Sequence, residues 1–229
     1  MINPYMFHDD TIYEIGVDEA GRGPLFGRVY AAAVILPKSN DFDFSKIKDS
    51  KKFHSKKKIE EVAKYIKEHA LAWHISFEDE KVIDNINILQ ATQQCMHSAI
   101  LQCRKKYMKL NSKKEFIDYK YHLLIDGNYF NDLTFINPNT ARLEAFPHTT
   151  VKGGDDLYSS IAAASILAKV ERDKYIEELC AENPDLKENY GIDKNKGYGA
   201  KIHIDGIKQY GITKWHRKSF GICKNYTEK

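Results

Sequence analysis

The chain has 229 residues, 42% of them hydrophobic and 29% charged, with a formal net charge of +3 at pH 7. This length suits one domain with at most a small appendage, and the apolar content is sufficient for a packed core. No apolar run approaches the ~20 residues of a membrane span, and residues 1–10 lack the basic and apolar parts of a secretion signal, so we expect a cytoplasmic protein that does not bind membranes.

The first third of the chain predicts strands on either side of a helix. Residues 11–17 alternate between polar and apolar side chains, and residues 29–37 form an almost continuous apolar run. We expect these to be neighbouring strands joined by a tight, glycine-containing connection. Residues 55–70 begin with a serine cap signal and show helical periodicity, and residues 71–78 predict another strand.

The middle of the chain predicts a long helix over residues 84–107 and a short buried strand over residues 121–127. The buried face of that helix is expected to carry Ile88, Leu89, Thr92, Met96, Ala99 and Ile100. The strand ends at an acid and a glycine, Asp126 and Gly127.

The last part predicts one strand over residues 143–151, limited by Pro147, and then two helices, over residues 156–179 and near residues 199–210. Strands first and helices interleaved later indicate an α/β fold, with helices packed against a mixed sheet. From about residue 183 the composition turns to glycine, lysine and aromatic residues, which marks a C-terminal part.

The four cysteines are predicted to be reduced thiols that pack in the core. Cys95, Cys103, Cys180 and Cys223 include no pair at CxxC spacing, and the first two lie in a helical pattern. A disulfide framework or a zinc site is therefore disfavoured.

Two basic runs stand out against the small net charge. Residues 46–58 contain seven lysines, and residues 104–114 contain six basic residues and no acid. Each run alone is typical of a solvated surface, but two of them beside an acidic motif favour a polyanionic partner. The lysine- and tyrosine-rich segment 104–122 is expected to be a loop or a helix extension, and no function can be assigned to it.

Residues 21–27, GRGPLFG, place three glycines after a strand, as a dinucleotide-binding loop does. Such a loop must lead into a helix whose N-terminus faces the pyrophosphate. Residues 29–37 instead have the Val and Ile content of a strand, and the glycine spacing fits poorly. We therefore exclude a dinucleotide site.

Carboxylates stand at the ends of several predicted elements. Asp18 and Asp126 each end an apolar run that is too buried to carry an isolated carboxylate without a partner. Asp155 and Asp156 stand at the start of the helix expected over 156–179, where acids are ordinary caps. Together these positions suit a hard cation such as Mg²⁺, which takes oxygen ligands and retains several waters.

Glu19 follows Asp18 directly, and adjacent residues of a strand point to opposite faces. Glu19 can therefore share a site with Asp18 only where the chain bends. Gly21 and Gly23 are placed to permit a bend, which we expect at this point.

Seven motifs, in one order along nearly the whole chain, resemble those of the bacterial ribonuclease HII family, a branch of the type 2 ribonucleases H. They are VDEAGRGPLFG at 17–27, DSKK at 49–52, NILQAT at 87–92, LIDG at 124–127, SIAAASILAKVERD at 160–173, NKGYGAKIH at 195–203 and HRKSF at 216–220. Each motif alone is modest evidence for the resemblance, but all seven in the family's order are highly specific evidence. The resemblance implies a ribonuclease H-like catalytic domain over residues 1–182, and a small helical C-terminal subdomain over residues 183–229 that packs on it and contributes to substrate binding.

The family uses four acids both as metal ligands and as catalytic residues. The resemblance gives these roles to Asp18, Glu19, Asp126 and Asp155. The last assignment rests on counting five residues back from Ile161, as in the family motif KGD. Because this chain reads KGGDD, Asp156 stays open as the ligand, with Asp155 as the cap.

The resemblance implies hydrolysis of an RNA phosphodiester with two Mg²⁺ or Mn²⁺ ions, which activate a water and stabilise the leaving 3′ oxygen. The implied substrates are RNA–DNA hybrids and duplex DNA with embedded ribonucleotides, cut 5′ of the ribonucleotide to leave 3′-hydroxyl and 5′-phosphate ends. No histidine or serine nucleophile is required. For His203 and His216 we expect packing or backbone hydrogen bonding.

The resemblance also names substrate-binding residues. In the family the GRG turn senses the 2′-hydroxyl, the group that distinguishes RNA from DNA, and the tyrosine of KGYG stacks on the sugar of the next deoxyribonucleotide. The lysines are expected to contact phosphates, which gives affinity without sequence preference. The residues are Gly21, Arg22, Gly23, Tyr198, Lys51, Lys52 and Lys169.

Two alternatives remain open, a related carboxylate nuclease restricted to hybrids and a non-catalytic nucleic-acid-binding relative. The intact acids disfavour the second, because a binder would gain from losing negative charge near phosphates. Arg22 distinguishes the chain from the ribonuclease HIII branch, whose motif at this turn resembles GTG. That branch also carries an additional N-terminal domain, which we do not expect here because the motif begins at Gly16. We expect a monomer, since residues 220–229 show no sliding-clamp peptide and no other partner is indicated.

Overall fold

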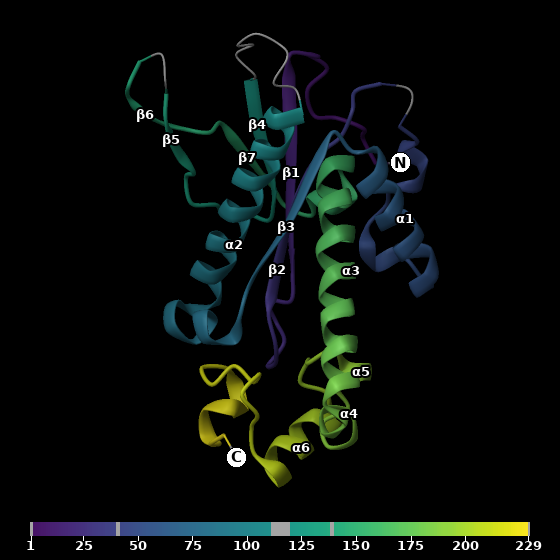
Figure 1. Ribbon diagram of the computed structural model, residues 1–229, viewed down its shortest axis with the longest axis vertical. Coiled ribbons are helices and arrows are strands. Elements are labelled where there is room, and N and C mark those ends of the chain that lie inside the picture. Colours follow the sequence, from purple (N-terminus) through teal and green to yellow (C-terminus); the bar gives the residue numbers. More distant parts are fainter. Residues whose placement is uncertain (1, 40–41, 111–119, 138–139, 229) are drawn as a thin grey trace.

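The computed structural model describes residues 2–39, 42–110, 120–137 and 140–228. Within them, a five-stranded sheet forms the centre of the molecule (Figure 1). Its strands, in spatial order, are β3 (Ala72–Glu78), β2 (Val29–Ile35), β1 (Ile12–Ala20), β4 (Lys120–Asp126) and β7 (His148–Val151). β2 is antiparallel to β1 and β3, whereas β4 is parallel to β1 and β7. This is the mixed sheet that the sequence predicted.

Helices cover both faces of the sheet (Figure 1). The helices of the described residues are α1 (Lys56–His69), α2 (Glu80–Leu110), α3 (Ser159–Glu182), α4 (Pro184–Glu188), α5 (Ile192–Asn195) and α6 (Lys201–Tyr210). The first three cover the sheet, and α4, α5 and α6 lie beyond one end of it. Short 3₁₀ turns are η1 (Phe44–Lys46), η2 (Ser50–Lys52), η3 (Gly154–Asp156) and η4 (Gly221–Asn225). One apolar cluster joins α2 to β1 through Ile15 and Val17, and another joins α1 and α3 to β2 through Ala32 and Val34.

Small residues let α3 approach the sheet closely. A Cβ atom at Gly16 of β1 would lie 2.1 Å from the backbone carbon of Ser160, so only glycine fits there. The alanines at positions 162–164 are fully buried in the same apolar cluster as Ala32 of β2. The first turns of α3 are thereby held against the end of β1 that carries the acids.

The long helix α2 begins at Glu80, earlier than residue 84, where the sequence predicted it. It is interrupted at Asn87, whose φ of 67° is left-handed and whose Oδ1 accepts a bond of 3.1 Å from the N–H of Gln90. Asparagine tolerates this conformation and caps the second segment. On the predicted buried face, Ile88 and Leu89 are half-buried and the other four residues are buried. Residues 111–119 of the basic segment lie outside the described residues.

The single strand predicted over residues 143–151 is two strands, which corrects the prediction. β6 (Leu143–Ala145) pairs with β5 (Thr134–Ile136), a strand that the sequence pattern did not reveal, and β7 joins the main sheet. Pro147 separates them because it has no N–H for a ladder. Its carbonyl still accepts a bond of 2.9 Å from the N–H of Leu123.

α3 starts at Ser159, so Asp155 and Asp156 do not open it as predicted but belong to η3. The N-terminal segment reaches this point. Asn3 donates its N–H to the carbonyl of Leu157 at 2.9 Å, and its own carbonyl accepts the N–H of Ser159 at 2.9 Å. The first residues of the chain thus fix the junction between η3 and α3.

The C-terminal part lies at one end of the sheet, beyond the last turns of α3 (Figure 1). Its core joins Leu186, Tyr190 and Ile207 to Phe26 and Ile176 from the rest of the chain. The division at residue 183 stays a prediction, because the two parts share this apolar cluster.

All four cysteines are buried and unbonded, as expected. Burial is the main cause that raises the pKa of each, so these thiols are inert packing groups. Among the described residues, no helix has the length and apolar character to cross a bilayer.

Candidate active site

The carboxyl ends of β1 and β4 bring Asp18 and Asp126 to the same edge of the sheet. The two strands are parallel and adjacent, with Val17 opposite Ile125, so the residues that follow lie side by side. Asp18, Glu19 and Asp126 all border one cleft with a volume of about 530 Å³. The cleft therefore contains three of the four acids that the sequence singled out.

The bend expected between Asp18 and Glu19 is not present. β1 stays paired with β2 through Ala20, with Glu19 opposite Ala31. Both acids border the cleft because they stand at the last residues of the strand, where side chains of either face reach the sheet edge. The chain turns only afterwards, at Gly21, whose φ is +93°.

The carboxylates of Asp18, Glu19 and Asp126 repel one another when no cation lies between them. Burial raises the pKa of Asp18 well above its ordinary value, and the charges of Glu19 and Asp126 raise it further. The Ser165 hydroxyl and the N–H of Glu19, at 2.7 Å, offset this only partly. Burial also raises the pKa of Glu19 and of Asp126. A cation placed among these groups would relieve both burial and repulsion.

The structure separates Asp155 from its neighbour. Asp155 is 5% exposed, and its charge raises the pKa of Asp126. Asp126 in turn accepts bonds from η3, including one of 2.7 Å from the N–H of Gly154. The Asp156 side chain is 46% exposed and pairs with Lys52. These contacts favour Asp155 over Asp156 as the fourth acid of the site.

Two of the acids hold cations supplied by the chain itself. Lys51 Nζ lies 3.0 Å from Asp155 Oδ2, and Arg22 Nη1 lies 3.2 Å from Glu19 Oε1. Lys169, at the same cleft, pairs with Asp173 at 3.0 Å. Of the predicted phosphate-binding lysines, Lys51 and Lys169 line the cleft and Lys52 does not, but all three have carboxylate partners.

The donor set suits a hard cation. In the described part of the chain, no three Asp, Glu, His or Cys side chains are already gathered in a closed metal-binding group. The acids instead surround an open cleft, with raised pKa values and two cationic side chains beside them. Mg²⁺ and Mn²⁺ accept such a site, because they bind few carboxylates and complete their shells with water and phosphate.

The glycine turn is held by two buried arginines that the sequence reasoning did not single out. Arg217 is fully buried, and its guanidinium donates to the carbonyls of Gly21, Arg22, Pro24 and Gly27 at 2.6–2.9 Å. Arg172 donates to the carbonyls of Phe26, Arg28 and Lys196. Both residues lie in motifs quoted above, but their partners are backbone carbonyls, which a side-chain pattern does not reveal.

Tyr198 faces the same cleft and is 52% exposed, which is unusual for a large aromatic residue in an ordered loop. A Cβ atom at Gly23 would lie 3.4 Å from the Tyr198 ring. A Cβ at Gly21 would lie 2.2 Å from Arg172 Nε. The two predicted glycines therefore differ, because Gly21 is required by the protein's own packing and Gly23 leaves room beside the tyrosine.

His203 and His216 do what the sequence predicted, which is hydrogen bonding to backbone and packing. His203 Nδ1 lies 2.9 Å from the carbonyl oxygen of Tyr198, and His216 Nδ1 lies 3.0 Å from the N–H of Thr213. Both rings are fully buried, and Phe26 packs edge-on against each.

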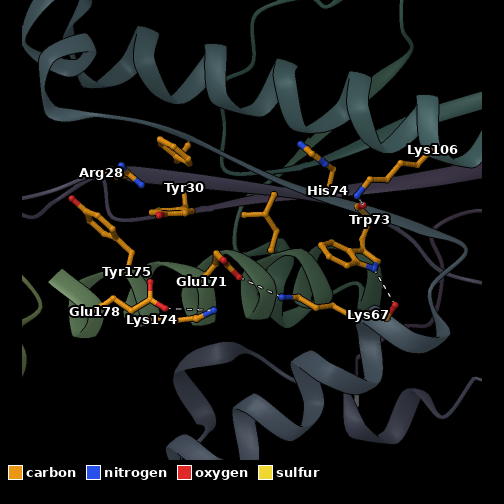
Figure 2. A pocket seen from close by; sticks show the side chains of 12 residues that line it. Arg28, Tyr30, Lys67, Trp73, His74, Lys106, Glu171, Lys174, Tyr175 and Glu178 are labelled. Atoms are coloured by element: carbon orange, nitrogen blue, oxygen red, sulfur yellow. Dashed lines mark hydrogen bonds and ion pairs between the residues drawn. The ribbon is translucent and has the colours of Figure 1, made fainter. Parts of the chain in front are cut away.

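A second hollow, of about 420 Å³, lies at the outer edge of β3 between α2 and α3 (Figure 2). Its cations have partners within the fold. Lys67 pairs with Glu171, Lys174 pairs with Glu178, and Arg28 stacks on aromatic rings. This hollow has no group of mutually repelling acids, so the cleft at β1 and β4 is the better candidate for the active site.

The family of the chain follows from its similarity to known proteins. The profile of the family described as ribonuclease HII matches residues 15–223. Ribonuclease HII of Parabacteroides distasonis is 43% identical over 222 residues, which cover 97% of this chain and 96% of that protein.

Solved structures show the same fold. The ribonuclease H2 of Pyrococcus horikoshii superposes with a TM-score of 0.65 at 21% identity, covering 93% of this chain and 96% of that one. The Bst RNase HIII in complex with Mn²⁺ superposes with a TM-score of 0.63 at 19% identity, covering 93% of this chain and 68% of that one. The ribonuclease H-like fold expected from the motifs is thereby confirmed. On the sequence match along nearly its entire length, this chain belongs to the ribonuclease HII family.

Proposed function

We propose that this endoribonuclease of RNA–DNA hybrids depends on Mg²⁺ or Mn²⁺ and also nicks duplex DNA 5′ of embedded ribonucleotides, leaving 3′-hydroxyl and 5′-phosphate ends. One observation carries the proposal. The acids at the ends of β1 and β4 border the same cleft as the GRG turn and Tyr198. A site for phosphodiester chemistry and a surface suited to a ribose thus share one cleft.

Asp18, Glu19, Asp126 and Asp155 would hold the metal ions. Bound there, the ions would supply an activated water and stabilise charge on the leaving 3′ oxygen. Asp18 is oriented by the Glu19 N–H, and Asp126 is oriented by the Gly154 N–H, each at 2.7 Å. Lys51 and Arg22 pair with two of these acids, Asp155 and Glu19, and would be available to contact substrate phosphates if metal ions took over the carboxylates.

Ribose recognition falls to the GRG turn and Tyr198. The backbone of Gly21, Arg22 and Gly23 borders the cleft and presents polar groups without bulky side chains. Tyr198 offers a half-exposed ring for stacking on the next sugar, a contact typically worth ~1–3 kcal/mol. Lys51, Lys52 and Lys169 would contact phosphates, which fixes register without reading sequence.

The test uses a labelled DNA duplex with a single ribonucleotide, incubated with Mg²⁺, Mn²⁺ or EDTA, and the products mapped to the nucleotide. We expect one nick on the 5′ side of the ribonucleotide, with either metal and not with EDTA. A fully RNA–DNA hybrid serves as the control substrate. Cleavage of the hybrid alone would establish the hybrid-restricted nuclease instead, and cleavage in EDTA would exclude the metal site. Monomeric state and the absence of clamp binding stay predictions.

A further inference from the structure

The motif HRKSF contains a buried arginine, Arg217, whose guanidinium donates hydrogen bonds to the carbonyls of one loop, residues 21–27. Arg217 Nη2 donates to Gly21 O at 2.6 Å, Nη1 donates to Arg22 O at 2.9 Å and to Pro24 O at 2.8 Å, and Nε donates to Gly27 O at 2.8 Å. Among the described residues, no carboxylate lies within ion-pair distance of this guanidinium. Burial lowers the pKa of Arg217 to about 9, which leaves it charged at neutral pH.

These bonds determine which way the peptides of the turn point. In a trans peptide, the carbonyl of one residue and the N–H of the next point in opposite directions. Because the carbonyls of Gly21 and Arg22 face Arg217, the N–H groups of Arg22 and Gly23 face away from it. Both residues border the catalytic cleft, and within the described chain neither N–H donates to another protein group. A buried positive charge behind the peptides also polarises these donors.

The residue before Arg217, His216, acts on the loop that carries Tyr198, next to the turn. Because the N–H of Thr213 donates to His216 Nδ1, that nitrogen carries no proton, and the proton of neutral His216 is on Nε2. His216 Nε2 therefore donates to His203 Nε2 at 3.0 Å, and His203 Nδ1–H donates to the carbonyl of Tyr198 at 2.9 Å. One chain of hydrogen bonds thus ends on the backbone of Tyr198.

Backbone bonds connect the same segments. Leu25 donates its N–H to the carbonyl of Gly197, and Arg217 donates its N–H to the carbonyl of Leu25, each at 2.9 Å. The N–H of Gly27 donates to the carbonyl of Trp215 at 2.8 Å. The turn, the Tyr198 loop and the HRKSF segment are therefore one hydrogen-bonded unit.

We infer that Arg217 is a positioning residue for ribose recognition, and that with the His216–His203 pair it sets the register between the N–H groups of the GRG turn and the Tyr198 ring. This inference rests on the proposed cleavage at single ribonucleotides. A lone ribonucleotide offers one 2′-hydroxyl followed by one deoxyribose, so both contacts must be satisfied at once. A hybrid offers many successive positions, and it tolerates an error in register better.

The test compares kcat/KM on the single-ribonucleotide duplex with kcat/KM on the hybrid. Arg217→Lys retains the charge but loses the planar fork that holds four carbonyls. We expect its activity on the single-ribonucleotide duplex to fall about tenfold more than its activity on the hybrid, since small misplacements at a reacting centre have effects of this size. His203→Phe keeps an aromatic ring beside Phe26 but removes the bond to Tyr198, and we expect the same selective loss.

Leu186→Ala is the matched control. Leu186 is buried in the apolar cluster that contains Phe26, and its side chain cannot form hydrogen bonds to the GRG turn or the Tyr198 loop. Its truncation therefore destabilises this region without changing the position of the turn relative to Tyr198. All variants are assayed at a temperature where circular dichroism shows them folded. Leu186→Ala should leave the ratio of the two activities unchanged.

The outcomes separate the two claims. If the wild type cleaves the hybrid but not the single-ribonucleotide duplex, the proposed function falls and this inference falls with it. If the wild type cleaves both and Arg217→Lys and His203→Phe lower both activities in parallel, as the control does, only this inference is overturned. A variant that is unfolded at every temperature also counts against it, because the replaced residue is then a stability element alone.

Discussion

The carboxylate edge of the sheet and the turn held by Arg217 both bury charge, and they compensate for it in opposite ways. At the edge, the acids of β1 and β4 lie close enough that burial and mutual repulsion raise the pKa of Asp18, Glu19 and Asp126. At the turn, the buried guanidinium is satisfied by four backbone carbonyls.

On the proposed function, this difference separates the region for chemistry from the region for recognition. The buried carboxylates lower the stability of the protein without metal, because their charges are not compensated. A metal ion bound among them would neutralise this charge. Satisfied positive charge fixes a backbone, because removing any partner would leave a buried group unpaired. We therefore expect variants at the edge to change activity and stability in opposite directions, and variants at the turn to lower both.

The largest expected effect is at the edge. Asp18→Asn should lower cleavage by about 10³-fold, since a metal ligand supports several kcal/mol of charge stabilisation in the transition state. It should also raise the free energy of unfolding in EDTA by about 1 kcal/mol, because it removes a buried charge repelled by Glu19 and Asp126. Single-turnover kinetics and urea unfolding measure the two quantities. Wild-type turnover in this variant would refute the metal assignment, and tight hybrid binding serves as the control for folding.

The next effect separates two neighbouring acids. Asp155→Asn should lower cleavage by about 10²-fold, because Asp155 is buried beside Asp126, whereas Asp156→Asn removes only an exposed partner of Lys52 and should leave cleavage near the wild-type rate. Cleavage rates measured at saturating Mn²⁺ distinguish the two variants. The reverse order of rates would make Asp156 the ligand and Asp155 the cap.

The turn gives a smaller but sharper contrast between two glycines. Gly21→Ala should lower the free energy of unfolding by about 2 kcal/mol, because its φ of +93° is left-handed and a Cβ would clash with Arg172. Gly23→Ala should stay within about 1 kcal/mol of wild type, since its Cβ makes ordinary contact with the Tyr198 ring. Thermal melts compare the pair, and equal losses would contradict the packing described for Gly21.

If Gly23→Ala folds normally, its activity tests recognition without interference from stability. We expect its kcat/KM on the single-ribonucleotide duplex to fall about tenfold, because the added methyl group stands between the backbone and the tyrosine. An unchanged rate would remove Gly23 from the recognition surface.

The smallest effect is on the pH dependence of stability. Burial lowers the pKa of His203 and lowers that of His216 to about 3, so the folded state keeps both rings neutral while the unfolded chain binds protons below about pH 6.5. The unfolded state then binds more protons, and stability falls as the pH falls from 6.5 toward 3. Between pH 7.5 and 5.5, wild type should lose about 1 kcal/mol more than His203→Phe in urea titrations. Parallel losses would show that His203 is protonated in the fold.

Most of the fold was accessible from the sequence, because apolar periodicity dictates β1, β2, β4 and the long helices. The pattern missed β5, which has only three residues and is too short to show a period. It also merged β6 with β7, although Pro147 indicated the break. The interruption of α2 at Asn87 left no signal in hydrophobicity, since its cause is a side-chain cap.

The candidate site was predictable to the extent that it depends on side-chain identity. Acids ending apolar runs identified Asp18 and Asp126, and the resemblance to the family motif favoured Asp155. The bend predicted at Glu19 was wrong, because side chains from both faces of a strand can reach the cleft at the end of that strand. Arg172 and Arg217 had no assigned role, because their partners are carbonyl oxygens contributed by residues of any type.

The bonds of Arg217 have a consequence for the nascent polypeptide. Its partner Gly21 is 196 positions away in the chain, and the hydrogen-bond partners of Asn3, Leu157 and Ser159, are also far from it in sequence. Because the ribosome delivers residues in order, these bonds to the turn cannot form until Arg217 has been synthesised. A truncated translation product therefore carries the acids of β1 and β4 without the finished recognition surface, and it is not expected to nick nucleic acid at selected sugars.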